Sequence, residues 1–224
     1  MSAQMLRDLD QLKRDLLTMG AHVEESIRKA IIALVDRRPE LAKEVKAADK
    51  EIDALENAID EACYRILALH QPVADDLRFV LTVIKVNNEL ERMGDHAKSI
   101  GKSAKLLAKA DPLPIYDDLN AASEATIAMV SKGLDALIKR DVGIAEQVRE
   151  MDDKVDDACD AAFQHVTRII TEKPDLTLYG ITAISACRHL ERIGDLATNI
   201  AKDVIFLVEG DNVRHGGRVP EAQE

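Results

Sequence analysis

Apolar residues recur at steps of three and four along almost the whole chain, which is the pattern of amphipathic helices. One clear stripe runs from Leu41 to Leu69 and another from Ala183 to Leu207. Alternating steps of three and four are typical of the seam of a left-handed helical bundle. The sequence lacks the β-branched and aromatic runs that strands prefer. The pattern therefore predicts an all-α protein.

Prolines and short polar breaks divide this pattern into six helices. The Asp111-Pro112-Leu113-Pro114 stretch is the strongest boundary, because two prolines stop a helix and make a short, stiff connector. The last stretch, Gly210–Glu224, is Gly-rich and polar, and we expect it to be a mobile tail. The predicted helices span Ala3–Arg37, Pro39–Leu69, Val73–Ala110, Asp117–Lys139, Val142–Thr171 and Asp175–Glu209.

The two halves of the sequence repeat each other. Leu90-Glu91-Arg92-Met93-Gly94-Asp95 returns as Leu190-Glu191-Arg192-Ile193-Gly194-Asp195, and Asp49 and Asp53 match Asp152 and Asp156. A repeat of this length indicates a duplicated supersecondary unit rather than a solenoid. We therefore expect two tandem antiparallel three-helix bundles related by internal duplication, in residues 1–111 and 112–209, followed by the tail 210–224.

Each half carries two acidic pairs spaced i, i+4, so each pair projects from one face of its helix. If a half folds back on itself at its central break, residues equally far from the break reach the same height. Asp53 and Glu91 are equally far from Pro72, as are Asp49 and Asp95. The corresponding pairs around the break at Lys173–Pro174 are Asp156 with Glu191 and Asp152 with Asp195.

This symmetry predicts two four-carboxylate clusters that could bind metal ions. Oxygen-rich sites suit hard or borderline cations, with Mg, Mn, Fe or Zn, divalent or trivalent, all conceivable, and no organic cofactor is indicated. His96 could add a ligand, although its counterpart is Leu196. Asn88 matches Arg188, whose charge could fill part of the second site, so the two sites could differ in affinity. The alternative is a pair of solvated acidic faces balanced by nearby arginines and lysines.

Charge and composition limit the partners. The net charge of −11 disfavours nucleic acid and anionic membrane surfaces. The three cysteines, Cys63, Cys159 and Cys187, form no CxxC pair, so we expect small buried side chains in a reducing compartment. No signal sequence or membrane span is evident, which favours a cytoplasmic protein.

No set of residues indicates catalysis. The sequence has no GxSxG, HExxH, P-loop or Gly-rich phosphate cradle, so we expect no enzyme and assign no catalytic residue. Two alternatives remain open. The carboxylate clusters could serve a metal-dependent enzyme, or the chain could be a metal-free helical scaffold.

The twice-occurring (E/D)xxxD motif, at Glu91–Asp95 and Glu191–Asp195, together with the earlier acidic pairs, resembles the PhoU family over about residues 3 to 209. The resemblance implies two three-helix bundles, commonly dimerised, with metal ions bound by the acidic motifs. It also implies negative regulation of the phosphate-starvation (Pho) regulon and cellular phosphate homeostasis. In that picture the protein is a non-catalytic adaptor between the ATPase of a phosphate ABC transporter (PstB-like) and a sensor histidine kinase (PhoR-like) of a two-component system.

Overall fold

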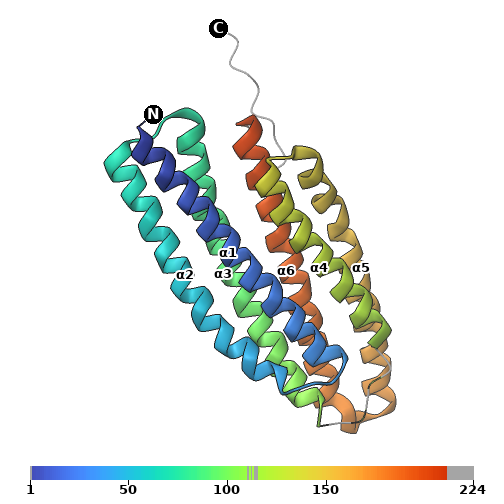
Figure 1. The fold of residues 1–224 in the computed structure, drawn as a ribbon. Coiled ribbons are helices and arrows are strands. Elements are labelled where there is room, and N and C mark those ends of the chain that lie inside the picture. The colour runs from blue at the N-terminus through green and yellow to red at the C-terminus, as the bar shows by residue number, and fades with distance from the viewer. Residues whose placement is uncertain (1, 110, 112, 114–115, 211–224) are drawn as a thin grey trace.

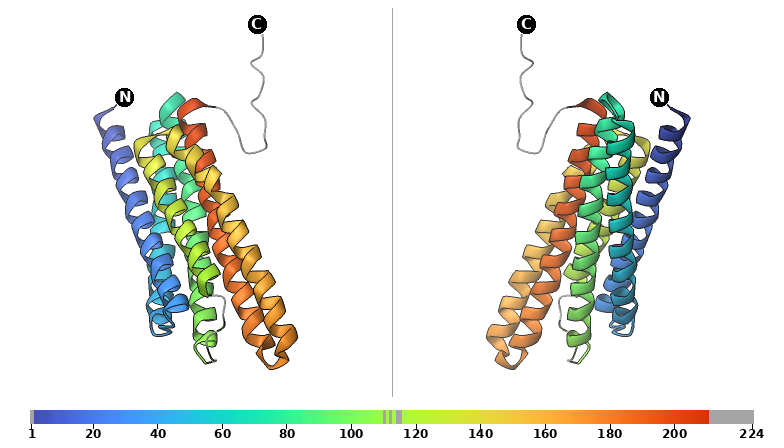
Figure 2. Two further views of the ribbon diagram at one scale, coloured as in Figure 1. Left: turned by 90° about the vertical axis from the view of Figure 1, so that its right-hand side faces the viewer. Right: turned by 90° about the vertical axis from the view of Figure 1, so that its left-hand side faces the viewer.

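Two helical bundles stand side by side, with their helices running along roughly one axis (Figures 1 and 2). The computed structural model describes residues 2–109, 111, 113 and 116–210, and within them the first bundle comprises α1 (Ala3–Val35), α2 (Leu41–His70) and α3 (Ala74–Leu107). The second comprises α4 (Tyr116–Lys139), α5 (Val142–Glu172) and α6 (Thr177–Glu209), with a short 3₁₀ turn, η1 (Pro174–Leu176), before α6.

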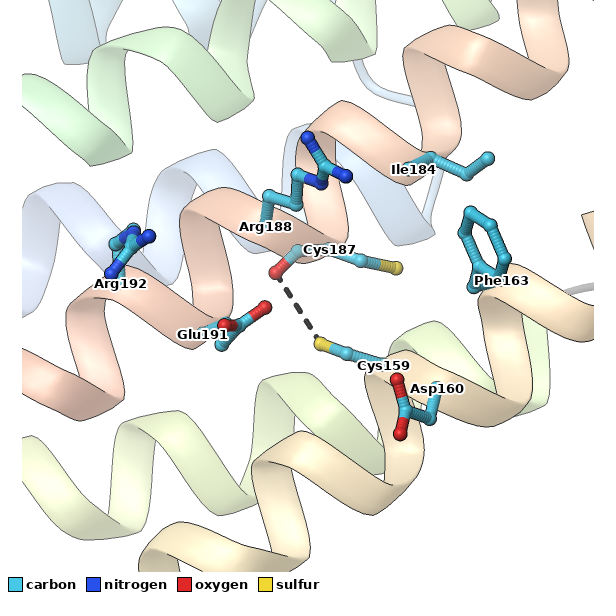
Figure 3. A pocket seen from close by; sticks show the side chains of 8 residues that line it. All are labelled: Cys159, Asp160, Phe163, Ile184, Cys187, Arg188, Glu191 and Arg192. Carbon is cyan, nitrogen blue, oxygen red and sulfur yellow. Dashed lines mark hydrogen bonds between the residues drawn. The ribbon is translucent and has the colours of Figure 1, made fainter.

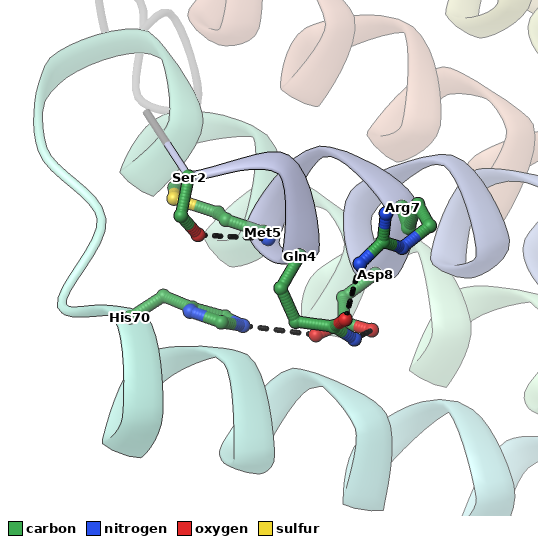
Figure 4. Close-up of polar contacts among 6 residues, drawn as sticks. All are labelled: Ser2, Gln4, Met5, Arg7, Asp8 and His70. Atoms are coloured by element: carbon green, nitrogen blue, oxygen red, sulfur yellow. Dashed lines mark hydrogen bonds and ion pairs between the residues drawn. The ribbon is translucent and has the colours of Figure 1, made fainter.

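Polar caps and left-handed residues set the helix ends. Ser2 accepts a hydrogen bond on its Oγ from the backbone N–H of Met5, with an N–O distance of 3.1 Å, and so caps α1 (Figure 4). Asp141 caps α5 in the same way through the N–H of Ile144 at 3.0 Å. Gln71, with φ of 44°, ends α2, and Gly210, with φ of 80°, ends α6.

One polar contact joins the end of α2 to the start of α1. His70, the last residue of α2, lies with its Nε2 2.9 Å from Asp8 Oδ2 near the start of α1 (Figure 4). This bond holds the pKa of Asp8 below its usual value, against the opposing effect of burial.

The two bundles meet mainly through α3 and α6, which make the most extensive contact of any two helices among the described residues. α1 also contacts α4. The buried apolar side chains of both halves belong to one continuous core, and the three cysteines are buried within it without a disulfide. The halves are therefore packed against each other as well as internally.

The structure confirms the prediction of an all-α fold with tandem three-helix bundles, and its helix bounds differ from the predicted ones only near the ends. The predicted apolar stripe of α2 is wrong at Leu69, which is 70% exposed. Pro112, Pro114 and the predicted tail after Gly210 lie outside the described residues, and the domain limits stay a prediction. In the part of the chain that is described, no helix is both long and apolar enough to cross a bilayer.

Candidate functional site

The first acidic cluster, Asp49, Asp53, Glu91 and Asp95, lies on the flank where α2 faces α3. Lys98 Nζ lies 2.6 Å from Asp49 Oδ2 and 3.0 Å from Asp95 Oδ1, so one ammonium bridges the two helices. The close approach of Ile52 to Gly94 fixes the same register: a Cβ on Gly94 would lie 3.2 Å from Ile52 Cδ1. Asp49 and Asp95 therefore stand at matched heights, as the sequence symmetry predicts.

The second acidic cluster, Asp152, Asp156, Glu191 and Asp195, occupies the corresponding flank between α5 and α6. A Cβ on Gly194 would lie 3.6 Å from Asp152 Oδ1, so Asp152 of α5 lies beside the turn of α6 that carries Gly194 and Asp195. Burial raises the pKa of Glu191, and Asp156 is close enough that its charge raises it further. Both hairpins thus bring their acidic pairs together.

Most of these carboxylates are partly hydrated, which agrees with a position on the flank rather than in the core. Asp49 is the exception at 8% exposed. Glu91, Asp152, Glu191 and Asp195 are half-buried, and Asp53, Asp95 and Asp156 are exposed.

Mutual repulsion is built into both clusters. Burial, then the charges of Asp95, Glu56, Asp53 and Asp49, raises the pKa of Glu91. Burial followed by the neighbouring acidic residues also raises the pKa of three members of the second cluster, namely Asp152, Asp156 and Glu191. The carboxylates are therefore held closer together than their charges favour, and a bound cation would relieve this repulsion.

The two clusters differ in the cation that the chain itself supplies. Lys98 belongs to the first cluster, and its hydrogen bonds to Asp49 and Asp95 raise its own pKa. Its counterpart in the repeat is Thr198, which carries no charge. In the second cluster Lys202 lowers the pKa of Asp152 through its charge, and Arg192 pairs with Asp195 at 2.9 Å. Lys98 therefore bridges two carboxylates of the first cluster, whereas Arg192 pairs with one carboxylate of the second.

Two residues that shape the clusters were missed in the sequence. Lys98 and Glu56 each lie three positions after a cluster residue, Asp95 and Asp53, and so could have been found on the same helix faces. Arg188 was expected to fill part of the second site. Its charge does lower the pKa of Glu191, but within the described residues it forms no ion pair with a cluster carboxylate.

His96 turns toward the seam between the two halves. Its Nδ1 lies 3.1 Å from Nδ1 of His189, so one ring donates a hydrogen bond to the other across the contact between α3 and α6. Burial lowers the pKa of both rings, with further repulsion from nearby positive charges. His189 thus lies at the interface between α3 and α6.

The side chains fit a metal ion by donor type but are not drawn together around one. Carboxylate oxygens at matched heights on facing helices suit Mg, Mn, Fe or Zn. Across the residues that the structure describes, no three His, Cys, Asp or Glu side chains converge closely enough to hold an ion as they stand. In the first cluster Lys98 would have to leave its two carboxylates before a cation could take its place.

Comparison with known proteins gives matches over nearly the whole chain. The family model described as "PhoU domain" matches twice, at residues 16–104 and 119–204, once in each bundle. A curated relative from Pseudomonas aeruginosa, "Phosphate-specific transport system accessory protein PhoU homolog", is 37% identical over 217 residues, covering 96% of this chain and 90% of the relative. The Escherichia coli K12 "Phosphate-specific transport system accessory protein PhoU" is 34% identical over 216 residues, covering 96% and 90%.

Solved structures give the same answer for the fold. The crystal structure of PhoU from Pseudomonas aeruginosa matches with a TM-score of 0.88 at 36% identity, covering 91% of this chain and 98% of that one. The phosphate transport system regulatory protein PhoU from Streptococcus pneumoniae matches with a TM-score of 0.85 at 28% identity, covering 93% and 99%. These names describe accessory and regulatory proteins, which confirms the prediction that the chain is not an enzyme. The double match of the domain and the identity over almost the full length show that the chain belongs to the PhoU family.

Proposed function

We propose that the chain is an accessory protein of a phosphate transport system that regulates phosphate uptake and phosphate-starvation signalling. The observation that carries the proposal is the relation to relatives named for phosphate-specific transport, at 37% and 34% identity over 96% of the chain. A duplicated helical scaffold without catalytic motifs suits such a role, because its large helical faces are available for binding other proteins.

The finer proposal is an adaptor that works in the cytoplasm, as a homodimer. It would contact the ATPase of a phosphate ABC transporter on one side and a sensor histidine kinase on the other. When phosphate is plentiful, the assembly would keep the kinase from activating its response regulator, which is negative regulation of the Pho regulon. The two halves offer two related but chemically different surfaces, which suits an adaptor with two partners.

Pull-down from purified components tests the adaptor. The tagged chain is mixed with the transporter ATPase or with the cytoplasmic part of the sensor kinase, at high and low phosphate. We expect both to be retained at high phosphate. Retention of neither protein at any phosphate concentration would count decisively against the adaptor.

The proposal includes metal binding at both acidic clusters. Asp49, Asp53, Glu91 and Asp95 would hold one ion and Asp152, Asp156, Glu191 and Asp195 the other, with His96 a further candidate for the first. A bound cation would neutralise the carboxylates and link two helices of one hairpin. Burial, and after it the neighbouring carboxylates, raises the pKa of Glu91, Asp152, Asp156 and Glu191, and this supports the proposal because both effects disfavour a charged cluster without a cation.

Elemental analysis tests the metal separately from the adaptor. Protein purified without chelator should contain Mg, Mn, Fe or Zn, and the content should fall in a variant that carries Asp156→Asn and Glu191→Gln. If the unsubstituted protein carries no metal and binds none on addition, the clusters are acidic faces only. The adaptor would be unaffected by that result.

A further inference from the structure

The duplication places a surface pocket at the same position in both halves. In the second half it lies between α5 and α6, has a volume of about 530 Å³, and includes Ile184 in its wall (Figure 3). In the first half it lies between α2 and α3, has a volume of about 330 Å³, and includes the matching Ile84. The fold therefore makes this hollow twice, and the side chains decide what each copy can bind.

The chemistry of the two hollows has diverged. The repeat register set by Asp49/Asp152 and by Leu90/Leu190 gives four residues of the second pocket a counterpart that also lines the first: Cys159 with Glu56, Phe163 with Asp60, Ile184 with Ile84 and Arg188 with Asn88. Three lining positions change from acidic or neutral in the first half to apolar or basic in the second. The changes are Glu56 to Cys159, Asp60 to Phe163 and Asn88 to Arg188.

The second pocket opens onto exposed apolar surface. Phe163 is 49% exposed, and Ile181, near the pocket on α6, is 57% exposed. Ile181, Ile184 and Arg188 are spaced i, i+3, i+7 and so lie along one face of α6. Figure 3 shows Phe163 and Ile184 together at one end of the pocket, with Arg192 at the other. Aromatic residues and arginine are enriched at the cores of protein interfaces.

The pocket of the second half also has an uncommitted positive charge. Arg188 is exposed and, within the described residues, makes no hydrogen bond or ion pair. Its neighbour Arg192 is paired with Asp195 at 2.9 Å. The cation of the first pocket, Lys85, is held instead by the buried Asp203 at 3.3 Å. An incoming carboxylate would therefore find a partner at Arg188, whereas the cation that lines the first pocket, Lys85, is already paired. Asp160 and Glu191 restrict how such a carboxylate can approach.

We propose that the groove between α5 and α6 at Phe163, Ile184 and Arg188 binds an acidic amphipathic helix of a partner protein. The partner helix places large apolar side chains against Phe163 and Ile184 and a carboxylate on Arg188. The inference rests on the proposed function only in that an adaptor must bind another protein. The duplicate groove at Asp60, Ile84 and Asn88 does not bind the same helix.

A library of displayed helices tests the groove without knowledge of the partner. A phage library of randomised 16-residue helices is panned against the intact chain, and enriched sequences are synthesised and their Kd measured by fluorescence anisotropy. We expect them to combine acidic with large apolar residues. Arg188→Asn and Phe163→Asp each copy the first-half residue at an exposed position, so we expect the chain to stay folded, and each should weaken binding about tenfold or more.

Two matched controls complete the experiment. Arg168→Asn removes the same charge from an exposed position on α5 outside the pocket, and Asn88→Arg adds it to the first groove while Asp60 remains there. Both should leave the Kd within about twofold of the unsubstituted chain, which is the scatter expected of a neutral surface change.

The proposal is overturned if no sequence is enriched, if enriched sequences are not acidic, or if Arg188→Asn and Phe163→Asp bind them unchanged. It is also overturned if sedimentation shows that these two substitutions abolish self-association, because the groove would then be occupied by a second copy. Failure of the pull-down with the ATPase and kinase would leave the library result standing, so the two proposals can fail independently.

Discussion

At the scale of single residues, Gly180 is needed for the close approach of α6 to α5, whereas Gly133 leaves room for a larger side chain. A Cβ added to Gly180 would lie 2.6 Å from Ile170 Cγ2 and 2.9 Å from Val166 Cγ1, so α6 packs directly against two β-branched side chains of α5. We expect Gly180→Ala to destabilise the protein, because overpacking costs about 1–3 kcal/mol and outweighs the roughly 1 kcal/mol that a helical alanine contributes over glycine. Urea unfolding measures the change.

Gly133 in α4 is the matched control for this substitution. A Cβ there would meet Ala197 O at 3.7 Å and Ile200 Cγ2 at 3.9 Å, which are ordinary contacts. Gly133→Ala should therefore raise the free energy of unfolding by about 1 kcal/mol. Equal effects at the two positions would show that the close packing at Gly180 is not limiting.

A single position also distinguishes the two acidic clusters as cation sites. Lys98→Met removes the ammonium between Asp49 and Asp95, so the first cluster should bind Mn²⁺ about tenfold more tightly, since a charge pair near 4 Å is worth about 1–4 kcal/mol and tenfold is about 1.4 kcal/mol. Calorimetric titration with Mn²⁺ is made in a chain whose second cluster is disabled by Asp156→Asn and Glu191→Gln.

The reverse experiment uses a chain whose first cluster is disabled instead. There Thr198→Lys should weaken the binding of Mn²⁺ to the second cluster. If Lys98→Met and Thr198→Lys both left the Mn²⁺ affinity unchanged, the residue at this position would not distinguish the two clusters.

Asp8 gives the chain a stabilising contribution that depends on pH. Because His70 holds the pKa of Asp8 below 3.8, the ionised carboxylate stabilises the folded state above that pH, and the contribution is lost as the pH falls through the lower, folded-state pKa. Asp8→Asn should therefore be less stable than the unsubstituted chain at pH 6, and the two should converge in strong acid. Asp10→Asn, an exposed change on the same helix, should show no such trend. If the free energies of unfolding of Asp8→Asn and of the unsubstituted chain differed by the same amount at every pH in the acid range, this role of Asp8 would be refuted.

At the scale of helices, the sequence predicts most of what the structure contains. Periodicity and prolines locate the α-helices of the described residues, because a long amphipathic stripe can be buried in few other ways. The register of the two hairpins also follows from counting residues, as the contacts of Lys98 with Asp49 and Asp95 show. Spacing places Lys98 on the helix face of Asp95, but it does not show that the ammonium also reaches Asp49 on the other helix. Counting also cannot show which helices meet between the bundles, so the pairing of His96 with His189 was missed.

The contact between α3 and α6 contains a polar link that can be tested by a double-mutant cycle. Lys85 Nζ of α3 lies 3.3 Å from Asp203 Oδ1 of α6, and the Asp203 side chain is 1% exposed. Lys85→Met should lower the free energy of unfolding by roughly 1–3 kcal/mol, the range for a hydrogen bond to a charged group. Combining it with Asp203→Asn should cost less than the sum of the two single changes. Strict additivity in urea unfolding would show that the link contributes nothing between the bundles.

At the scale of the whole molecule, duplication has produced two bundles that share one core. Apolar side chains from α1 to α6 form a single buried cluster, and α3 with α6 makes the largest helix contact among the described residues. Separating the bundles would expose much of that surface, so neither half should persist while the other unfolds. We expect calorimetry to show one transition, with the van't Hoff enthalpy equal to the calorimetric enthalpy.

Mn²⁺ bound to the second cluster alone should raise the temperature of that single transition as a whole, because a ligand of the folded state stabilises everything that unfolds with its site. Two transitions, of which only one responds to Mn²⁺, would mean that the halves are energetically independent and that a signal received by one bundle stops at the seam.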